Sequence, residues 1–111
     1  MSEKVFLGID TSNYTTSIAV SDIDGNIVLN LKKLLDVKEG ERGLRQSDAV
    51  FHHTNQLGDI LKELLLNAGD IRAVGVSAKP RNIAGSYMPC FLVGKTAAEI
   101  ITYTCGAKLY Y

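Results

Sequence analysis

Hydrophobic residues at the start of the chain recur in the patterns of β-strands. Residues 5–9 form a continuous apolar run, as expected for a central strand that is buried on both faces. Two further stretches, 15–21 and 27–35, are rich in β-branched and apolar residues. Short polar turns separate these segments, at 10–13 and at 22–26, and the second turn contains an Asp-Gly step that favours a tight hairpin. The pattern predicts an antiparallel meander of three strands.

The spacing of apolar residues becomes helical after a charged segment. Residues 36–48 contain two glycines and show no apolar period, so we expect an exposed, mobile loop there. Residues 49–68 place apolar side chains at every third or fourth position, which predicts a helix. Ser47 or Asp48 can cap the start of this helix, and Gly69 can end it.

The second half of the chain alternates between strand and helix patterns. Residues 71–78 predict a fourth strand, which Pro80 ends, and because a helix precedes it we expect it to run parallel to the first strand. Residues 91–104 are apolar on nearly all sides and include small residues, a pattern that suits a helix packed closely against a sheet. Gly106 ends this helix, and residues 107–111 begin a fifth strand.

Together these segments predict an α/β fold. Three antiparallel strands are followed by a helix, a strand, a second helix and a last strand, which gives a mixed five-stranded sheet. If the fourth strand lies beside the first, the arrangement is ribonuclease H-like. The chain has 111 residues, of which 46% are hydrophobic, and this is the size and composition of a single domain.

Composition and charge exclude several classes of function. Twelve basic and twelve acidic residues cancel, so the net charge creates no field that would attract the chain to nucleic acid or to an anionic membrane. No apolar segment is long enough to span a bilayer, and the short run at 5–9 is no secretion signal. Cys90 and Cys105 have the spacing of neither a disulfide framework nor a zinc site, so we expect two reduced thiols in a cytoplasmic protein.

Candidate chemistry lies first in the polar turn after the opening strand. Its residues are Asp10, Thr11, Ser12 and Asn13. Their backbone N–H groups and hydroxyls could bind phosphate oxygens, and Asp10 could hold a hydrated divalent cation. The alternative is that they only satisfy the hydrogen bonds of a turn. The segment matches no glycine-rich phosphate motif, so these residues alone favour the turn.

Two other segments carry weaker signals. His52 and His53 are successive positions on the predicted helix, about 100° apart, so they cannot jointly chelate one ion and are expected at the helix surface or in its packing. We therefore name no metal ligand. Residues 79–86 follow a parallel strand and precede a helix, the usual position for ligands in an open α/β sheet. Lys79 and Arg81 could hold a phosphate there or be solvated loop charges, and the sequence leaves both interpretations open.

Several motifs together resemble the start of one family. They are Leu7-Gly8-Ile9-Asp10-Thr11-Ser12 with its hairpin, Ala73-Val74-Gly75-Val76-Ser77, and Pro89-Cys90-Phe91-Leu92-Val93-Gly94 leading into Thr96-Ala97-Ala98. This is the universal tRNA threonylcarbamoyladenosine-synthesis family, long called O-sialoglycoprotein endopeptidase or glycoprotease. It belongs to the superfamily of actin, heat-shock chaperone ATPases and sugar kinases. The resemblance runs through essentially the whole chain.

The resemblance implies an actin-like ATPase lobe, with residues 1–111 as the N-terminal lobe of a two-lobed protein. It implies that the opening strand and its hairpin form the first phosphate-binding element of a nucleotide site. Asp10, Thr11, Ser12 and Asn13 would then be the binding residues. ATP or threonylcarbamoyl-adenylate, with a divalent metal, is expected for the full-length family. The family's reaction passes a threonylcarbamoyl group from the adenylate to N6 of an adenosine in tRNA.

The chain also departs from the family pattern. An acidic pair follows the Thr-Ser of the family's first hairpin, whereas this chain has Tyr14-Thr15-Thr16. Lys79-Pro80-Arg81 replaces a Gly-Pro-Gly turn after the fourth strand. The family's paired metal histidines and its second lobe would lie beyond Tyr111. We therefore expect a divergent paralogue, and no turnover by these residues alone, because half a site lacks enclosed, preorganised electrostatics.

A second interpretation is a non-catalytic interaction module. A shorter paralogue in the family pairs with the catalytic subunit through helices of its N-terminal lobe. The apolar helix at 91–104 needs cover on more than one side, which together with the missing acidic pair favours this interpretation. If residues 107–111 form an edge strand without a neighbour, we also expect copies of the chain to associate through this edge. A peptidase, as the historical name suggests, is not supported, because neither a zinc motif nor a nucleophile with its base is visible.

Overall fold

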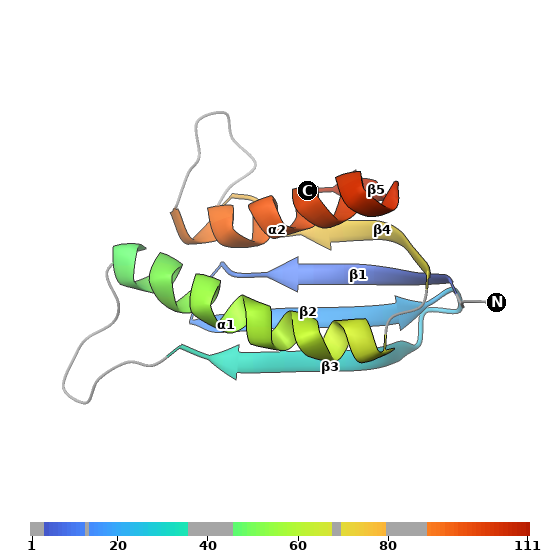
Figure 1. The fold of residues 1–111 in the computed structure, drawn as a ribbon, viewed down its shortest axis with the longest axis horizontal. Helices are drawn as coiled ribbons and strands as arrows, with labels where there is room; N and C mark the ends of the chain where they lie inside the picture. The colour runs from blue at the N-terminus through green and yellow to red at the C-terminus, as the bar shows by residue number, and fades with distance from the viewer. Residues whose placement is uncertain (1–3, 13, 36–45, 68–69, 80–88) are drawn as a thin grey trace.

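The computed structural model describes residues 4–12, 14–35, 46–67, 70–79 and 89–111 (Figure 1). In chain order its elements are β1 (Lys4–Asp10), β2 (Thr15–Asp22), β3 (Ile27–Leu34), α1 (Gln46–Asn67), β4 (Asp70–Val76), α2 (Pro89–Cys105) and β5 (Lys108–Tyr110). The strands form one sheet in the order β3-β2-β1-β4-β5. The β1–β2 and β2–β3 pairs are antiparallel, whereas β1–β4 and β4–β5 are parallel. The predicted α/β fold, with a mixed five-stranded sheet and the fourth strand beside the first, is confirmed.

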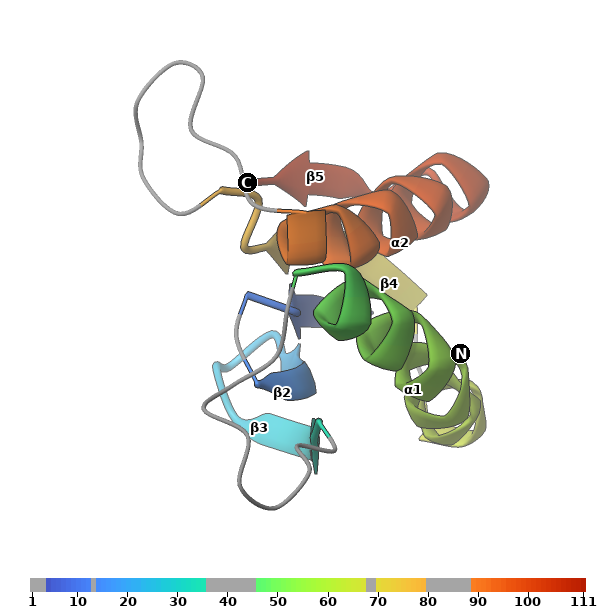
Figure 2. The same cartoon turned by 90° about the vertical axis from the view of Figure 1, so that its left-hand side faces the viewer.

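Both helices lie on one face of the sheet (Figures 1 and 2). Val5, Leu7 and Ile9 of β1 point toward the helices and are buried, whereas Phe6 on the opposite face is 39% exposed. The expectation that this strand is buried on both faces is therefore wrong for the part of the chain that the structure describes. Successive side chains of a strand point to opposite faces of the sheet. Because α1 and α2 pack against each other on one side, the other face of β1 stays open.

The hydrophobic core lies between this pair of helices and the sheet. Its buried members are Val5, Leu7, Ile9, Ile18, Val20, Val74 and Val76 from the strands and Leu57, Ile60, Leu64 and Ala98 from the helices. Leu57, Ile60 and Leu64 belong to the stripe that predicted the first helix, so the helical period is confirmed as far as residue 64. Full burial of each large aliphatic side chain contributes about 1.5–3 kcal/mol.

The helix ends differ in part from those expected. α1 begins at Gln46, so residues 46–48 are helical rather than loop, and the Asp48 carboxylate lies in the first turn, where the helix dipole favours negative charge. The rest of the predicted loop, at 36–45, and the proposed cap Gly69 lie outside the described residues. Gly106 ends α2 with φ at 70°, as predicted. Within the described ranges, neither helix has the length and hydropathy needed to cross a membrane.

The turn between β2 and β3 is held by one aspartate. Its carboxylate, on Asp22, accepts the backbone N–H groups of Asp24 and Asn26, each at 2.9 Å, and the Asn26 side-chain amide at 3.1 Å. Hydrogen bonds from Asn26 are the main reason that the pKa of Asp22 lies below its ordinary value of 3.8. Gly25 adopts a φ of 85°, which favours glycine. The hairpin predicted from the Asp-Gly step is confirmed.

Candidate functional site

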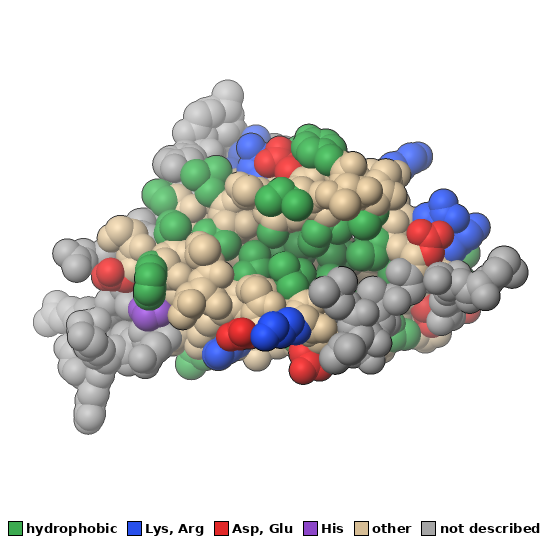
Figure 3. Space-filling view, viewed as in Figure 1, with side chains coloured by type: hydrophobic (Ala, Val, Ile, Leu, Met, Phe, Trp, Pro, Cys, Tyr) green, Lys and Arg blue, Asp and Glu red, His purple; other side chains and the backbone are tan. Residues whose placement is uncertain are grey.

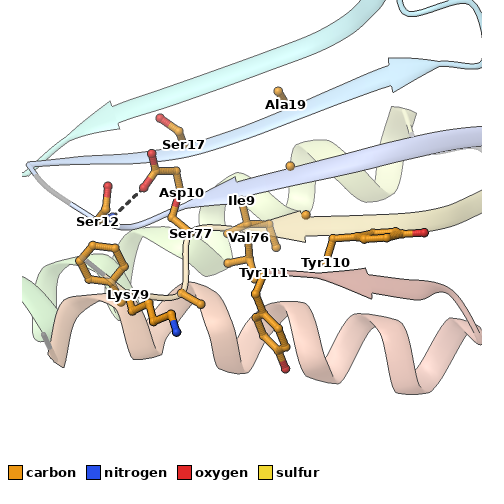
Figure 4. Close-up of a pocket in the computed structure, with 14 residues that line it drawn as sticks. Ile9, Asp10, Ser12, Ser17, Ala19, Val76, Ser77, Lys79, Tyr110 and Tyr111 are labelled. Atoms are coloured by element: carbon orange, nitrogen blue, oxygen red, sulfur yellow. Dashed lines mark hydrogen bonds between the residues drawn. The ribbon is translucent and has the colours of Figure 1, made fainter. Parts of the chain in front are cut away.

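An open cavity of ≈ 990 Å³ lies at the carboxyl ends of β1 and β4 and extends over the sheet face that the helices leave free (Figure 4). Asp10 and Ser12 line it from the end of β1, Ser17 from β2, and Ser77 and Lys79 from the segment after β4. Open α/β sheets bind ligands at the carboxyl ends of their strands. Two of the predicted binding residues, Asp10 and Ser12, therefore line a cavity where this fold class places its ligands.

The Asp10 carboxylate is surrounded by small polar groups. The Ser12 backbone N–H donates to its Oδ1 at 2.8 Å, which closes a tight turn directly after β1. Asp10 lies opposite Ser17 in the β1–β2 register. The Ser77 N–H donates to the Ile9 carbonyl at 3.2 Å, which places Ser77 beside Asp10 on the other side. Among the described residues, none is hydrogen-bonded to the hydroxyl of Ser17 or Ser77, so both are available to a ligand.

Sequence reasoning missed Ser17 and Ser77. The hairpin after β1 pairs Asp10 with a residue near the start of the next strand, and Ser77 directly follows the last residue of the parallel neighbour, β4. The register of the predicted sheet therefore contained the signal that places both serines around Asp10. Neither belongs to the motifs of the polar turn.

Thr11 connects the turn to α2. Its side chain is fully buried, and its hydroxyl donates to the Cys90 carbonyl at 2.8 Å and accepts the Gly94 N–H at 3.0 Å. Gly94 lies so close that a Cβ there would be 2.9 Å from Thr11 Oγ1. The Thr11 hydroxyl is thus engaged by the first turns of α2, while its neighbours Asp10 and Ser12 face the cavity.

The structure describes only part of the remaining predicted segments near the turn. Asn13 lies outside the described residues, as does the loop at 79–86 apart from Lys79, which is exposed at the cavity rim.

The Cys90 thiol donates a hydrogen bond to the Ser12 carbonyl at 3.6 Å, and burial is the main cause that raises the pKa of this thiol. Cys90 and Cys105 are both free cysteines, as expected for reduced thiols.

The oxygen atoms around the cavity define what it can bind. Among the residues that the structure describes, no group of three or more histidines, cysteines, aspartates or glutamates could enclose a metal ion. One carboxylate with neighbouring hydroxyls instead suits a magnesium ion that keeps several waters and binds a ligand's phosphates at the same time. The donor set therefore fits a hydrated divalent cation with a phosphate ligand.

Of the two histidines of α1, predicted at the helix surface or in its packing, His53 packs inside and His52 stays partly exposed. His53 is fully buried, and its Nδ1 lies 2.7 Å from the Thr16 hydroxyl of β2. The Gln56 side-chain amide donates to the same hydroxyl at 3.1 Å and to the Lys33 carbonyl at 3.3 Å. His52 makes an edge contact with the ring of Phe51, at 5.5 Å between centroids. The network of Thr16, His53 and Gln56 fixes α1 to the base of the hairpin that carries the site.

An apolar groove runs between the two helices on the molecule's outer face. It has a volume of ≈ 400 Å³ and is lined by side chains that include Leu61, Leu92, Val93 and Ile100. Figure 3 shows hydrophobic side chains gathered over this part of the helical face. Ile100 is 60% exposed and the neighbouring Tyr103 is 77% exposed. Exposed apolar surface of this kind marks interaction sites.

The fold places the chain in a structural class. YeaZ from Pseudomonas aeruginosa aligns with a TM-score of 0.65 and 14% identity, covering 96% of this chain and 41% of YeaZ. Thermus thermophilus RuvC aligns with a TM-score of 0.52 and 14% identity, covering 96% of this chain and 61% of RuvC. At these identities the likeness concerns the fold, which is that of ribonuclease H-like, actin-like ATPase lobes.

Sequence relatives narrow the class to one family. No protein-family model matches the chain. The tRNA N6-adenosine threonylcarbamoyltransferase of Methanopyrus kandleri is 31% identical over 109 residues, which are 95% of this chain and 30% of the relative. The transferase of Thermofilum pendens is 27% identical over 107 residues, 93% of this chain and 30% of the relative. The chain belongs to the glycoprotease family that contains these transferases, and it spans about 30% of the length of these curated relatives.

Proposed function

We propose that the chain supplies the first phosphate-binding element of a nucleotide site, as the N-terminal lobe of a two-lobed, glycoprotease-like protein. The observation that carries the proposal is the position of Asp10 and Ser12 in the open cavity at the end of β1, between Ser17 and Ser77. The relatives are threonylcarbamoyltransferases acting on tRNA. ATP or threonylcarbamoyl-adenylate is therefore the ligand that we assign to the site.

Each residue of the turn has a separate role in this proposal. The hydroxyls of Ser12, Ser17 and Ser77 donate hydrogen bonds to phosphate oxygens. Asp10 binds the hydrated cation that is coordinated by the nucleotide's phosphates. When bound, this cation neutralises phosphate charge. Thr11 positions the turn on α2 through its buried hydroxyl. Asn13 is assigned to the site on the family resemblance alone.

The complete reaction requires parts that these residues do not supply. We propose that the full-length protein acts in the cytoplasm and that tRNA binds outside this lobe, whose twelve basic and twelve acidic residues give no net positive charge. The cavity described here is open on one side. Because catalysis needs an enclosed, preorganised site, the lobe by itself is proposed to bind nucleotide without turnover.

Asp10→Asn is expected to lower the affinity for magnesium ATP by about tenfold, equivalent to about 1.4 kcal/mol. The amide oxygen can still accept the Ser12 N–H, but the charge that attracts the cation is lost. In a chelating buffer without divalent cation, the same variant is expected to bind ATP no more weakly than the original chain, because a carboxylate repels bare phosphate. Chemical-shift titration of backbone amides measures both affinities and shows whether Ser12, Ser17 and Ser77 respond.

A matched control is Asp24→Asn, which removes the same charge from the exposed turn between β2 and β3. It is expected to leave the affinity for magnesium ATP unchanged. Equal losses in both variants would reduce the effect to overall charge, and an unchanged affinity in Asp10→Asn would remove Asp10 from the site.

A second function is supported by the groove between α1 and α2. We propose, as the alternative, that the lobe is a non-catalytic subunit that binds a paralogous glycoprotease-family protein through these helices. The supporting observation is the apolar lining of the groove together with the exposure of Ile100 and Tyr103. Large side chains that a partner buries, tyrosine among them, contribute most of the binding energy of protein interfaces.

Ile100→Lys is expected to weaken binding of a catalytic paralogue by at least about tenfold, because a charge would be buried in an apolar contact. Ile23→Lys, the same substitution at an isoleucine that is 64% exposed in the turn between β2 and β3, is the control and is expected to bind normally. Calorimetry with the purified paralogue measures both. Equal binding by the two variants would exclude this groove as the interface.

A further inference from the structure

One edge of the sheet has the features of a pairing surface. β3 is the last strand in the order β3-β2-β1-β4-β5, and it is eight residues long, whereas the opposite edge strand, β5, has three (Figure 1). Three apolar side chains of β3, Ile27, Val28 and Leu34, are 62%, 52% and 69% exposed. A long edge strand with exposed apolar residues is a template for a further strand.

The backbone phase of β3 shows which groups are available for pairing. The Leu35 N–H donates to the Tyr14 carbonyl at 2.7 Å. In an antiparallel pair every second residue bonds its neighbour, so Lys33 and Leu31 also direct their N–H and C=O groups toward β2. The residues between them, Asn30, Lys32 and Leu34, direct theirs away from the sheet, toward the open edge.

A second copy of β3 matches this edge in one register. If Leu31 lies opposite the second copy's Leu31, then Asn30 lies opposite Lys32 on both sides of the two-fold axis. Val28, which has no partner in β2 because the β2–β3 register shifts there, falls beside Leu34. This register pairs the outward-facing residues with one another and joins the exposed apolar side chains, which stabilise cross-strand pairs. A shift that centres the axis on Lys32 would instead set two lysines face to face.

We propose that two copies of the chain associate through β3 as antiparallel strands, centred on Leu31, to form one continuous sheet across a two-fold axis. Such an interface is isologous and closes at two copies. It lies on the edge of the sheet, away from the groove between α1 and α2. The contact is small, so the dimer is weak and depends on concentration.

The charges of β3 determine the salt dependence of this dimer. Lys32 and Lys33 are the charged residues of the strand, and no acidic residue accompanies them. Four lysines therefore gather along the seam, and their mutual repulsion opposes association. Because salt screens exposed charges, the dimer is expected to become tighter as ionic strength rises. An interface held by ion pairs would respond in the opposite direction.

Disulfide trapping tests the register. Leu31→Cys places two thiols directly opposite each other, within the spacing that a disulfide needs. Leu29→Cys is the matched control, because Leu29 also packs half-buried against the core from β3. In the proposed register, residue 29 of one copy lies opposite residue 33 of the other. The two copies of residue 29 are then four positions, roughly 13 Å, apart along the strands, too far for a disulfide. Both variants carry Cys105→Ser, since Cys105 is exposed and Cys90 is buried.

Mild oxidation is expected to convert Leu31→Cys into a covalent dimer at least about tenfold faster than Leu29→Cys. Sedimentation of the original chain is expected to show a monomer–dimer equilibrium that shifts toward dimer in high salt. Equal trapping of the two variants would overturn the register. A monomer at every concentration and salt level, or growth beyond two copies, would overturn the dimer itself.

Discussion

Gly94→Ala is expected to destabilise the fold by about 2 kcal/mol, although alanine favours helices over glycine by about 1 kcal/mol. The added Cβ would lie 2.9 Å from Thr11 Oγ1 and 3.3 Å from a methyl carbon of both Ile9 and Val76. None of these neighbours can move freely. Ile9 and Val76 are core residues, and the Thr11 hydroxyl both donates and accepts a hydrogen bond. Urea unfolding measures the loss.

The control for this substitution is Gly58→Ala on α1. A Cβ at Gly58 has no other atom within 4 Å, so only helix propensity acts, and a gain of about 0.5–1 kcal/mol is expected. Opposite signs for the two glycines would show that close packing of α2 against β1 sets the cost at Gly94. A gain of stability at both positions would contradict the close approach.

Thr16→Val is expected to cost about 2 kcal/mol, because it keeps the shape of the side chain but removes the oxygen at the centre of a buried network. His53 Nδ1 would lose its partner on β2, and Gln56 would retain only its 3.3 Å bond to the Lys33 carbonyl. Buried polar groups without partners are costly in a low-dielectric interior. Thermal and urea unfolding of the variant measure the effect.

Thr54→Val tests whether loss of a threonine hydroxyl is enough by itself. Thr54 is exposed on α1 and bonds only the Val50 carbonyl of its own helix turn. Its substitution is expected to change the free energy of unfolding by less than about 0.5 kcal/mol. A cost at Thr16 no larger than that at Thr54 would show that the buried network contributes nothing to stability.

Much of the fold was predictable because it rests on local patterns. The apolar run at 5–9, the Asp-Gly turn and the stripe of Leu57, Ile60 and Leu64 each reflect a backbone period or a turn residue that acts over a few positions. The parallel placement of β4 beside β1 followed from the helix between them. The start of α1 was less predictable, since residues 46–48 lack apolar side chains and carry no period.

The site was predictable only in part. Asp10 and Ser12 stood out as polar residues at the end of an apolar strand, and both line the cavity. Ser17 and Ser77 were missed because they meet Asp10 through the sheet register and not through neighbouring positions in the chain. The family relationship was visible from the opening Gly-Ile-Asp-Thr-Ser and the Pro-Cys-Phe-Leu-Val-Gly segments, because each keeps a distinctive run of residues.

The sequence by itself determined the order of strands and helices, the α/β class, the family and the segment that carries the candidate chemistry, because these depend on neighbouring residues. Only the tertiary structure decided that both helices cover one face of the sheet, which leaves the other side of β1 open. It also decided that the Thr11 hydroxyl bonds Cys90 and Gly94, 79 and 83 positions away, while His53 meets Thr16 across 37 positions. Such contacts join residues that no local pattern connects, and they arise only when packing brings α1 and α2 against the sheet.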